Sequence, residues 1–427
     1  MSKGKPLRSS GPDRVNPGRR AALRALLRVD RGERGDRALE LEAPPEGRDR
    51  ALAWHLLSGT LQHRAEADHL IGASSSRAIA TLQPAVLAVL RMATYELRHG
   101  RAPARAVVHQ AAELTRSEAS RGAVGFVNAV LRNQQRRAGE IPPRLLLNHP
   151  EWLLERWEQR YGAPAAAAWA QSNNQPPPLC LAASGPVVEL DALLRAAGLE
   201  PEPALAAGAE VSGLLRVLGP VGQVSSLPGA SEGRWWVQDA AAAAVADLVG
   251  CQPGWRVLDA CAAPGGKTFR LISQGARVVA VDRSQPRLDQ LTEGLDRLGM
   301  QAELQQHDWI QGDLPGERPA FDAVLVDAPC SGLGTLRRHP EIRWRRAAHE
   351  LPENAQRQIA ILTAAARCVR SAGVLVYAVC SGEPEEGEQV ARRFLEQHDD
   401  FRQDVVFCSA PPSSGEDAFW AVRLLRG

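Results

Sequence analysis

Short apolar runs alternate with helical segments from Trp236 onward, and this alternation constrains the fold more than any other feature of the chain. Runs rich in Val and Leu that end in small or acidic residues are typical of buried parallel strands. Because helical patterns separate these runs, we expect a parallel, doubly wound α/β sheet over residues 236–427. The predicted strands are Trp255–Asp259, Arg277–Val281, Ala302–Gln305, Ala323–Val326 and Val374–Val379. The predicted helices are Asp239–Val249, a helix from Thr268, Leu288–Leu298, Asn354–Val369 and Glu385–Gln397.

The residues before this region predict three further parts. Between residues 19 and 140, Ala-, Leu- and Arg-rich segments have helical periodicity, which indicates a compact all-α domain. Residues 141–235 mix short apolar runs with helix-like stretches, so we expect a small α+β module there. Residues 1–18 are expected to form a flexible basic arm. The predicted helices of the all-α domain are Arg19–Val29, Asp49–Leu61, Gln83–His99, Arg105–Ser117 and Val124–Arg136.

Composition and charge exclude several classes of protein. The chain has 427 residues, 44% of them hydrophobic, and no apolar run is long enough to cross a membrane. Its seven cysteines form no CxxC pair, which argues against a metal site of the zinc type and favours a reducing, cytoplasmic compartment. Residues 1–28 hold eight basic side chains against one acid, Asp13. That pattern is typical of nucleic-acid binding and also of a solvated tail.

A loop of small residues follows the first predicted strand and precedes a helix. Small side chains let a ligand approach the backbone, and a helix N-terminus favours anionic groups. Asp282, after the second predicted strand, is placed to accept hydrogen bonds from ribose hydroxyls. A P-loop would need Gly where Cys261 stands, and no GxGxxG is present, so S-adenosyl-L-methionine and a purely structural turn remain as alternatives. The loop consists of Cys261, Ala262, Ala263, Pro264, Gly265, Gly266 and Lys267.

Two cysteines, Cys330 and Cys380, each follow the end of a predicted strand. Because ligands bind beyond the carboxyl ends of parallel strands, we expect both thiols to face one crevice. Paired thiols beside a ligand indicate covalent chemistry, whereas two buried structural cysteines are the simpler interpretation. Lys267 is the only lysine after Lys5, which singles out this position in a chain that otherwise uses arginine.

Three motifs together resemble the RNA cytosine-5 methyltransferases of the Sun (Fmu) family, and the resemblance covers most of the chain. These motifs are Cys261–Lys267, Asp327–Ser331 and Tyr377–Ser381. The longer run Asp327–Trp344 is similar to the family member that modifies bacterial 16S ribosomal RNA. Upstream, the segments that resemble a NusB-like RNA-binding domain and its connecting regions are Gly125–Asn133, His149–Trp157 and Val237–Asp239.

The sequence departs from the family pattern at three places. Val379 stands where Thr usually precedes the second cysteine, and this removes a hydroxyl group. Gly387 replaces the usual Asn, and Leu181–Ser184 occupies the position of an expected Arg-x-Asn strand. The resemblance still implies a Rossmann-like class I methyltransferase domain that uses S-adenosyl-L-methionine, preceded by a NusB-like all-α domain and a small α+β module.

The resemblance implies roles for the two cysteines. Cys380 would be the nucleophile that adds to C6 of cytosine, which makes C5 nucleophilic enough to accept a methyl group. Cys330 would assist product release. Asp327 is placed to stabilise the ring at N3, because it lies shortly before Cys330 in the chain. We hypothesise that Lys267 lowers the pKa of the nucleophilic thiol. The predicted residues for S-adenosyl-L-methionine are Cys261, Ala262, Ala263, Pro264, Gly265, Gly266, Lys267, Asp282, Asp308 and Asp327, with Asp308 near the adenine.

An arginine-rich segment follows Cys330 and predicts contact with RNA, because guanidinium groups bind phosphates and an indole stacks on an unpaired base. The residues predicted to bind RNA are Arg337, Arg338, Arg343 and Trp344. A solvated arginine face is the alternative. C5 chemistry needs an unpaired or extruded base, so we expect free or partly assembled 16S ribosomal RNA as the partner of a monomeric, metal-free, cytoplasmic enzyme.

Two other functions compete with 16S ribosomal RNA cytosine-5 methylation. A tRNA cytosine-5 methyltransferase would keep the same chemistry, and the NusB-like domain weighs against it. A non-catalytic RNA-binding or antitermination factor would use the N-terminal domain alone. Binding alone needs neither Cys380 nor Asp327 nor the loop at Cys261–Lys267, so their presence favours an enzyme.

Overall fold

The computed structural model describes residues 15–44, 47–136, 140–219, 221–314, 320–413 and 415–427. Most of the expected basic arm therefore lies outside the described residues. The chain forms two compact units. The N-terminal unit contains the residues up to Leu154 together with His339–Arg345, and the second unit contains Glu155–Arg338 and Arg346–Gly427. Within the described ranges, every helix is too short or too polar to cross a lipid bilayer.

The N-terminal unit is all-α, as the sequence predicts. Its helices place apolar residues at helical spacing on a common core, in which Leu23, Leu56, Leu90 and Leu131 are fully buried. Four helices, α2, α4, α8 and α15, were not recognised in the sequence. The helices of this unit are α1 (Pro17–Asp30), α2 (Gly35–Glu42), α3 (Arg48–Gln62), α4 (Arg64–Ser74), α5 (Pro84–His99), α6 (Ala104–Leu114), α7 (Val124–Arg136), α8 (Pro143–Leu146) and α15 (Ile342–Arg345).

The second unit opens with a small antiparallel sheet that has the strand order β2-β3-β1-β4. Side chains from the sheet and from helix α11, including Leu181, Leu194 and Leu215, bury its inner face. The predicted α+β module is thus present in the structure. Its elements are α9 (Glu151–Tyr161, which contains the boundary between the units), α10 (Ala163–Ser172), β1 (Leu179–Ala183), α11 (Val187–Ala196), β2 (Glu200–Ala206), β3 (Ala209–Leu218) and β4 (Trp235–Val237).

A seven-stranded sheet forms the centre of the second unit, with the order β10-β11-β9-β8-β5-β6-β7. The five predicted strands, β5 to β9, run parallel, so their carboxyl ends share one edge. Two strands that were missed in the sequence extend the sheet, and β11 lies antiparallel between β9 and β10. The strands are β5 (Arg256–Asp259), β6 (Arg277–Asp282), β7 (Glu303–Gln306), β8 (Phe321–Asp327), β9 (Val369–Val379), β10 (Phe401–Cys408) and β11 (Trp420–Arg426).

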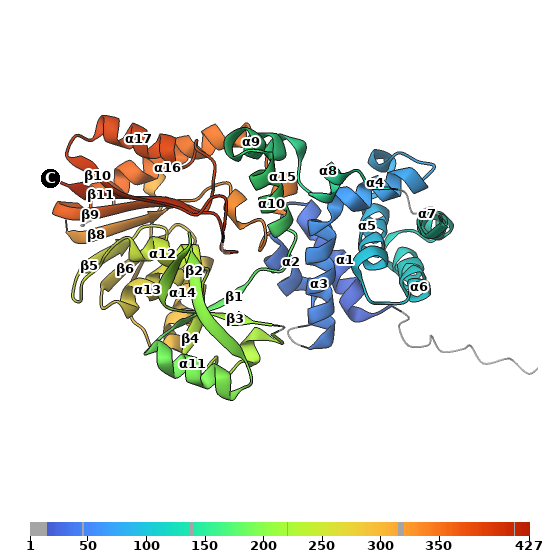
Figure 1. Cartoon of the computed structure of the whole chain (residues 1–427), viewed down its shortest axis with the longest axis horizontal. Helices are drawn as coiled ribbons and strands as arrows, with labels where there is room; N and C mark the ends of the chain where they lie inside the picture. Colours follow the sequence, from blue (N-terminus) through green and yellow to red (C-terminus); the bar gives the residue numbers. More distant parts are fainter. Residues whose placement is uncertain (1–14, 45–46, 137–139, 220, 315–319, 414) are drawn as a thin grey trace, which may run out of the picture. The chain divides into compact units, whose positions relative to one another are not determined.

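Helices cover both faces of this sheet, which explains why its strands are apolar on both sides. Val257 and Leu325 point into one core, whereas their neighbours Leu258 and Val324 point into the other. Figure 1 shows α16 and α17 on one face and α12 to α14 on the opposite face. The helices are α12 (Ala240–Asp247), α13 (Gly266–Ser273), α14 (Gln285–Leu298), α16 (Glu350–Ala366) and α17 (Glu388–Gln397).

Candidate active site

The loop between β5 and α13 is packed tightly against α14 within the second unit. Gly265 has a φ of +118°, and a Cβ atom there would lie 2.3 Å from Leu291 Cδ1, so only glycine fits. Thr268 Oγ1, on α13, donates a 2.7 Å hydrogen bond to Asp259 Oδ2 at the end of β5. Helix α13 begins at Gly266, two residues before the predicted start at Thr268, so the last two residues of the predicted loop form its first turn.

Three carboxylates lie at the carboxyl ends of neighbouring parallel strands: Asp259 on β5, Asp282 on β6 and Asp327 on β8. Burial raises the pKa of the Asp259 carboxyl to about 7, although its hydrogen bond from Thr268 opposes the shift. Burial and the charges of all three carboxylates raise the pKa of the Cys261 thiol well above its usual value. Cys261 therefore stays protonated and is not a thiolate nucleophile.

Asp282 is the last residue of β6, and Asp308 follows β7, so both lie at strand ends as the sequence predicts. The Asp282 carboxylate accepts hydrogen bonds from the backbone N–H groups of Ala263 at 3.3 Å and Ser284 at 2.9 Å. It thereby ties the loop after β5 to the end of β6. Asp308 is half-buried and caps a short 3-10 turn by accepting from Ile310 N at 3.1 Å. Their contact with a ligand stays a prediction.

Lys267 and Asp327 form an ion pair, with 2.7 Å between Nζ and Oδ2. The ammonium group also lies 4.8 Å from the centre of the Phe419 ring, a contact that was missed because Phe419 is distant in sequence. Burial lowers the pKa of Lys267, but the charges of Asp327 and Cys380 outweigh burial and raise it. Lys267 is therefore protonated in the resting protein, beside the carboxylate and the second cysteine.

Cys330 and Cys380 lie together, with their sulfur atoms 3.1 Å apart. This follows from the pairing of β8 with β9, which places Asp327 beside Ala378, and each cysteine lies just beyond its strand. The hydrogen bond with Cys380, followed by burial, raises the pKa of the Cys330 thiol well above its usual value. Cys330 therefore keeps its proton more strongly than a free thiol does.

Backbone contacts fix the two cysteine loops against each other. Gly334 N donates a 3.0 Å hydrogen bond to the carbonyl oxygen of Cys380, and Ala418 N donates one of 2.9 Å to the carbonyl oxygen of Gly334. A Cβ atom on Gly334 would lie 1.8 Å from the carbonyl oxygen of Ala418. The close approach therefore requires glycine at this position.

Two of the predicted RNA-binding arginines hold loops of the second unit. Arg338 donates to Asp239 Oδ2 at 2.8 Å and to Asp417 Oδ2 at 2.9 Å. Arg337 donates to backbone carbonyl oxygens, including that of Gly415 at 3.1 Å. Both guanidinium groups keep some exposed surface, so their contact with RNA stays a prediction.

The structure corrects the prediction for Arg343. This side chain is fully buried in the N-terminal unit, where Nη1 donates to the carbonyl oxygen of Asn148 at 3.0 Å. Burial lowers the pKa of Arg343 to about 9, although Glu341 opposes the shift. Trp344 is half-buried and donates through Nε1 to the carbonyl oxygen of Leu61 at 2.7 Å. Arg343 thus joins elements of a core, and an arginine-rich pattern does not distinguish that role from binding phosphate.

The described residues contain one histidine–glutamate cluster, which spacing along the chain did not reveal. In the N-terminal unit, His63 Nδ1 and His99 Nε2 lie 3.3 and 3.0 Å from the same oxygen of Glu66. Arg98 donates to the other carboxylate oxygen at 3.1 Å. This guanidinium already neutralises Glu66, so the cluster is explained as hydrogen-bonding partners around one buried carboxylate.

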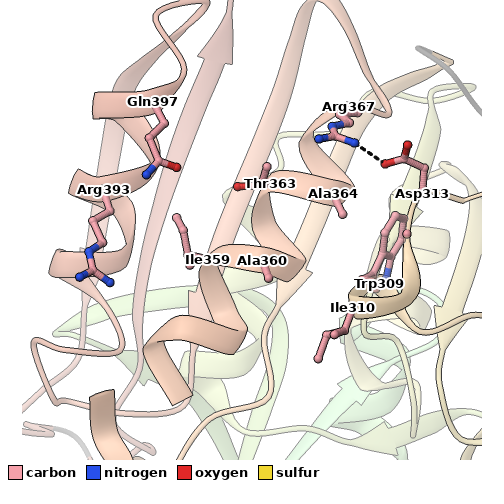
Figure 2. Close-up of a pocket in the computed structure, with 11 residues that line it drawn as sticks. Trp309, Ile310, Asp313, Ile359, Ala360, Thr363, Ala364, Arg367, Arg393 and Gln397 are labelled. Atoms are coloured by element: carbon pink, nitrogen blue, oxygen red, sulfur yellow. Dashed lines mark hydrogen bonds and ion pairs between the residues drawn. The ribbon is translucent and has the colours of Figure 1, made fainter. Parts of the chain in front are cut away.

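A separate surface hollow of about 560 Å³ lies between the turn at Trp309 and helices α16 and α17 (Figure 2). Asp313 and Arg367 form a 2.8 Å ion pair at its rim, and Ile310 is largely exposed. Its lining includes neither cysteine and none of the carboxylates at the strand ends. The candidate active site is therefore the strand-end cluster and not this hollow.

Comparisons with known proteins agree with the two-unit architecture. Residues 247–418 match the family described as 16S rRNA methyltransferase RsmB/F. Residues 16–136 match the NusB family, and residues 149–205 match a ferredoxin-like domain of RsmF/B-like methyltransferases.

Several whole proteins are similar over most of their length. Ribosomal RNA small subunit methyltransferase B of Serratia proteamaculans is 35% identical over 403 residues, covering 89% of this chain and 91% of that protein. A probable small subunit methyltransferase B of Synechocystis is 33% identical over 404 residues, covering 88% of this chain and 87% of that protein.

Solved structures share the fold. The crystal structure of the protein PH0851 matches with a TM-score of 0.81 at 22% identity, covering 98% of this chain and all (100%) of that one. A methyltransferase homologue from Pyrococcus horikoshii matches with a TM-score of 0.56 at 22% identity, covering 67% of this chain and 98% of that one. The all-α unit, the methyltransferase sheet and the similarity along the chain lead to one assignment. The chain belongs to the ribosomal RNA small subunit methyltransferase B family.

Proposed function

We propose that this protein transfers a methyl group from S-adenosyl-L-methionine to C5 of a cytosine in 16S ribosomal RNA through a covalent adduct between Cys380 and C6. The observation that carries the proposal is the contact between the Cys330 and Cys380 sulfur atoms, which lie 3.1 Å apart, together with the Lys267–Asp327 ion pair at the same strand ends. Nucleophilic catalysis by a thiolate needs such an arrangement, whereas RNA binding does not.

The strand-end cluster fits the methyl donor. Asp282, at the carboxyl end of β6, accepts a hydrogen bond from Ala263 N in the small-residue loop, a position from which an acidic side chain can also accept from ribose hydroxyls. S-adenosyl-L-methionine supplies a methyl group on a positively charged sulfonium when it is bound. The residues that would hold it are Cys261, Ala262, Ala263, Pro264, Gly265, Gly266, Lys267, Asp282, Asp308 and Asp327.

The protein's own groups would then act on an extruded or unpaired cytosine of free or partly assembled RNA. The Cys380 thiolate adds to C6, and Asp327 passes to N3 a proton that it receives from the Lys267 ammonium at 2.7 Å. C5 becomes nucleophilic and accepts the methyl group. Water takes the C5 proton, the Cys380–C6 bond breaks with its electron pair returning to sulfur, and N3 returns its proton to the Lys267–Asp327 pair. The Cys330 S–H stabilises the departing thiolate by a hydrogen bond.

Two cysteine variants test this mechanism with 16S ribosomal RNA and the methyl donor. Cys380→Ala is expected to give no turnover, and Cys330→Ala is expected to accumulate an RNA–protein adduct that survives denaturing electrophoresis. Cys408→Ala, which changes an exposed free cysteine, is the matched control and should methylate at the normal rate. A fully active Cys380→Ala enzyme would exclude the covalent route. Bisulfite sequencing of ribosomal and transfer RNA from a deletion strain then identifies the modified cytosine.

A further inference from the structure

Glu386 is a buried carboxylate that the chemistry above does not use. Its residue has no exposed surface, and it follows β9 in the turn before α17. A carboxylate buried in this way needs hydrogen-bond donors, since the loss of water otherwise destabilises the charged form. The groups that donate to Glu386 show which loops this side chain connects.

The main donors come from the residue next to Cys330. Ser331 donates twice to the carboxylate: its backbone N–H reaches Oε1 at 2.7 Å, and its hydroxyl reaches Oε2 at 2.5 Å. Asn354 Nδ2, on α16, donates to Oε1 at 3.1 Å. Glu386 therefore ties the backbone immediately after Cys330 to helix α16.

Pro329, the residue before Cys330, is held by a side chain of the same helix, α16. Gln358 Nε2 donates to the carbonyl oxygen of Pro329 at 3.0 Å and lies 3.4 Å from Glu386 Oε1. Both neighbours of Cys330 are thus fixed by groups that converge on one carboxylate. The charge of Glu386 also contributes to the raised pKa of the Cys330 thiol.

The same residue is anchored to the strand that carries Cys380. The hydroxyl of Tyr377, three residues before Cys380 on β9, donates to the backbone carbonyl of Glu386. The hydroxyl groups of Ser331 and Ser381 lie 3.4 Å apart, so the residues that follow the two cysteines also meet. Glu386 therefore links both loops whose sulfur atoms must stay in contact.

We propose that Glu386 is a positioning residue that holds the Cys330 thiol against the Cys380 sulfur and so sets the rate of product release. The inference rests on the proposed function for its effect on release, but the positioning itself is independent of RNA. A carboxylate accepts from all of these donors at once, whereas an amide would present an N–H group to one of them.

The first experiment tests whether the two thiols are held next to each other, by a chemical reaction that needs no RNA. Phenylarsine oxide bridges two adjacent thiols by forming two As–S bonds and releasing water. In the full-length protein it is expected to join Cys330 to Cys380 rapidly, as read by peptide mass spectrometry. Glu386→Gln should slow bridging about tenfold while alkylation of Cys380 by iodoacetamide stays within about twofold. Glu388→Gln, a change at an exposed carboxylate nearby, is the control and should bridge at the normal rate.

The second experiment measures release. Glu386→Gln should accumulate the RNA–protein adduct, as expected for Cys330→Ala, and should lower kcat at least tenfold with little change in the KM for the methyl donor. If Glu386→Gln does not fold, Ser331→Ala removes only one of the hydrogen bonds and should shift both readouts in the same direction by a smaller factor.

The outcomes separate the two proposals. Normal bridging in folded Glu386→Gln would overturn the positioning role, even if Cys330→Ala still traps RNA. Slow bridging in Glu386→Gln, combined with no adduct in any variant, would support positioning and overturn the covalent function. Slow bridging together with adduct accumulation supports both.

Discussion

Two stretches of one continuous run, Asp327–Gly334 and Arg337–Arg345, use their polar side chains in opposite ways. In the first stretch, Asp327 lies 2.7 Å from Lys267 and Cys330 lies 3.1 Å from Cys380, so reactive groups from neighbouring strands meet one another. In the second stretch, the arginines donate to carboxylates and carbonyl oxygens that join loops and helices.

The difference teaches which sequence signals carry positional information. The end of a parallel strand fixes where the next side chain lies, because the pairing of β8 with β9 sets the register. A guanidinium group has no such constraint, since phosphate, carboxylate and backbone oxygen are all suitable acceptors. The four predictions below test this contrast, from the largest expected effect to the smallest.

Replacing the carboxylate of the first stretch should have the largest effect. In Asp327→Asn, Lys267 loses its ion-pair partner and N3 loses its proton donor, so methyl transfer should slow about 1,000-fold. A single-turnover assay with radiolabelled methyl donor measures this rate. Asp322→Asn changes a carboxylate at the other end of the same strand and should stay within about threefold of the wild type. Equal losses in both variants would show that the effect is structural.

Separating the two cysteine loops should have the next largest effect. Gly334→Ala places a Cβ atom against the carbonyl oxygen of Ala418, so the backbone beside Cys380 must move. A displacement of this kind should reduce turnover about 100-fold. Gly185→Ala is the control, because its Cβ atom would meet open space. A Gly334→Ala enzyme with normal turnover would contradict the importance of this close approach.

In the second stretch, the expected effect is on stability. Arg343→Ala removes a buried side chain, and we expect the free energy of unfolding of the N-terminal unit to fall by about 2–4 kcal/mol. Hydrogen exchange of α3 and α5 amides measures that unit specifically. The control is Arg345→Ala at an exposed neighbouring position, which should change the free energy of unfolding by less than about 0.5 kcal/mol. Weaker RNA binding by Arg343→Ala with unchanged stability would restore the RNA-binding role.

The pH dependence of the N-terminal unit should show the smallest effect. Burial and the charge of Arg343 lower the pKa of His149 well below the usual value of 6.5, so the folded unit binds fewer protons than the unfolded chain. Stability should therefore be full above about pH 6.5 and decrease as the pH falls further, by at most about 1.4 kcal/mol per pH unit for this group. Stability measured by hydrogen exchange between pH 7.5 and 5.5 should depend less steeply on pH in His149→Gln than in the wild type. An unchanged slope would exclude His149 as the titrating group.

The sequence predicts the parallel strands well, because apolar runs flanked by turn residues have few other interpretations. It does not predict β10 and β11. β10 is an edge strand with mostly exposed side chains, so it lacks the apolar run that identifies the other strands. β11 directly follows irregular chain, and Arg423 interrupts its apolar run. Helix α2 was missed for a similar reason, because few of its side chains are buried.

The juxtaposition of the side chains at the candidate site was predictable only where strand ends define it. Cys330, Cys380 and Asp327 follow from the sheet, but Glu386 and Phe419 come from a turn and an antiparallel strand connection with no pattern of their own. For the same reason, sequence spacing did not reveal that Glu66 and His99 converge in the N-terminal unit.

The placement of β11 has a consequence for biosynthesis. The strand that leads to Cys380 pairs on one side with β8, which is made before it, and on the other side with residues 420–426, which are made after it. Until the ribosome has added these residues, β9 presents an open edge of unpaired backbone groups, a surface prone to association with other nascent chains. The protein is thus expected to bring Cys380 into its final position only late in translation, and chaperone protection should matter most in that interval.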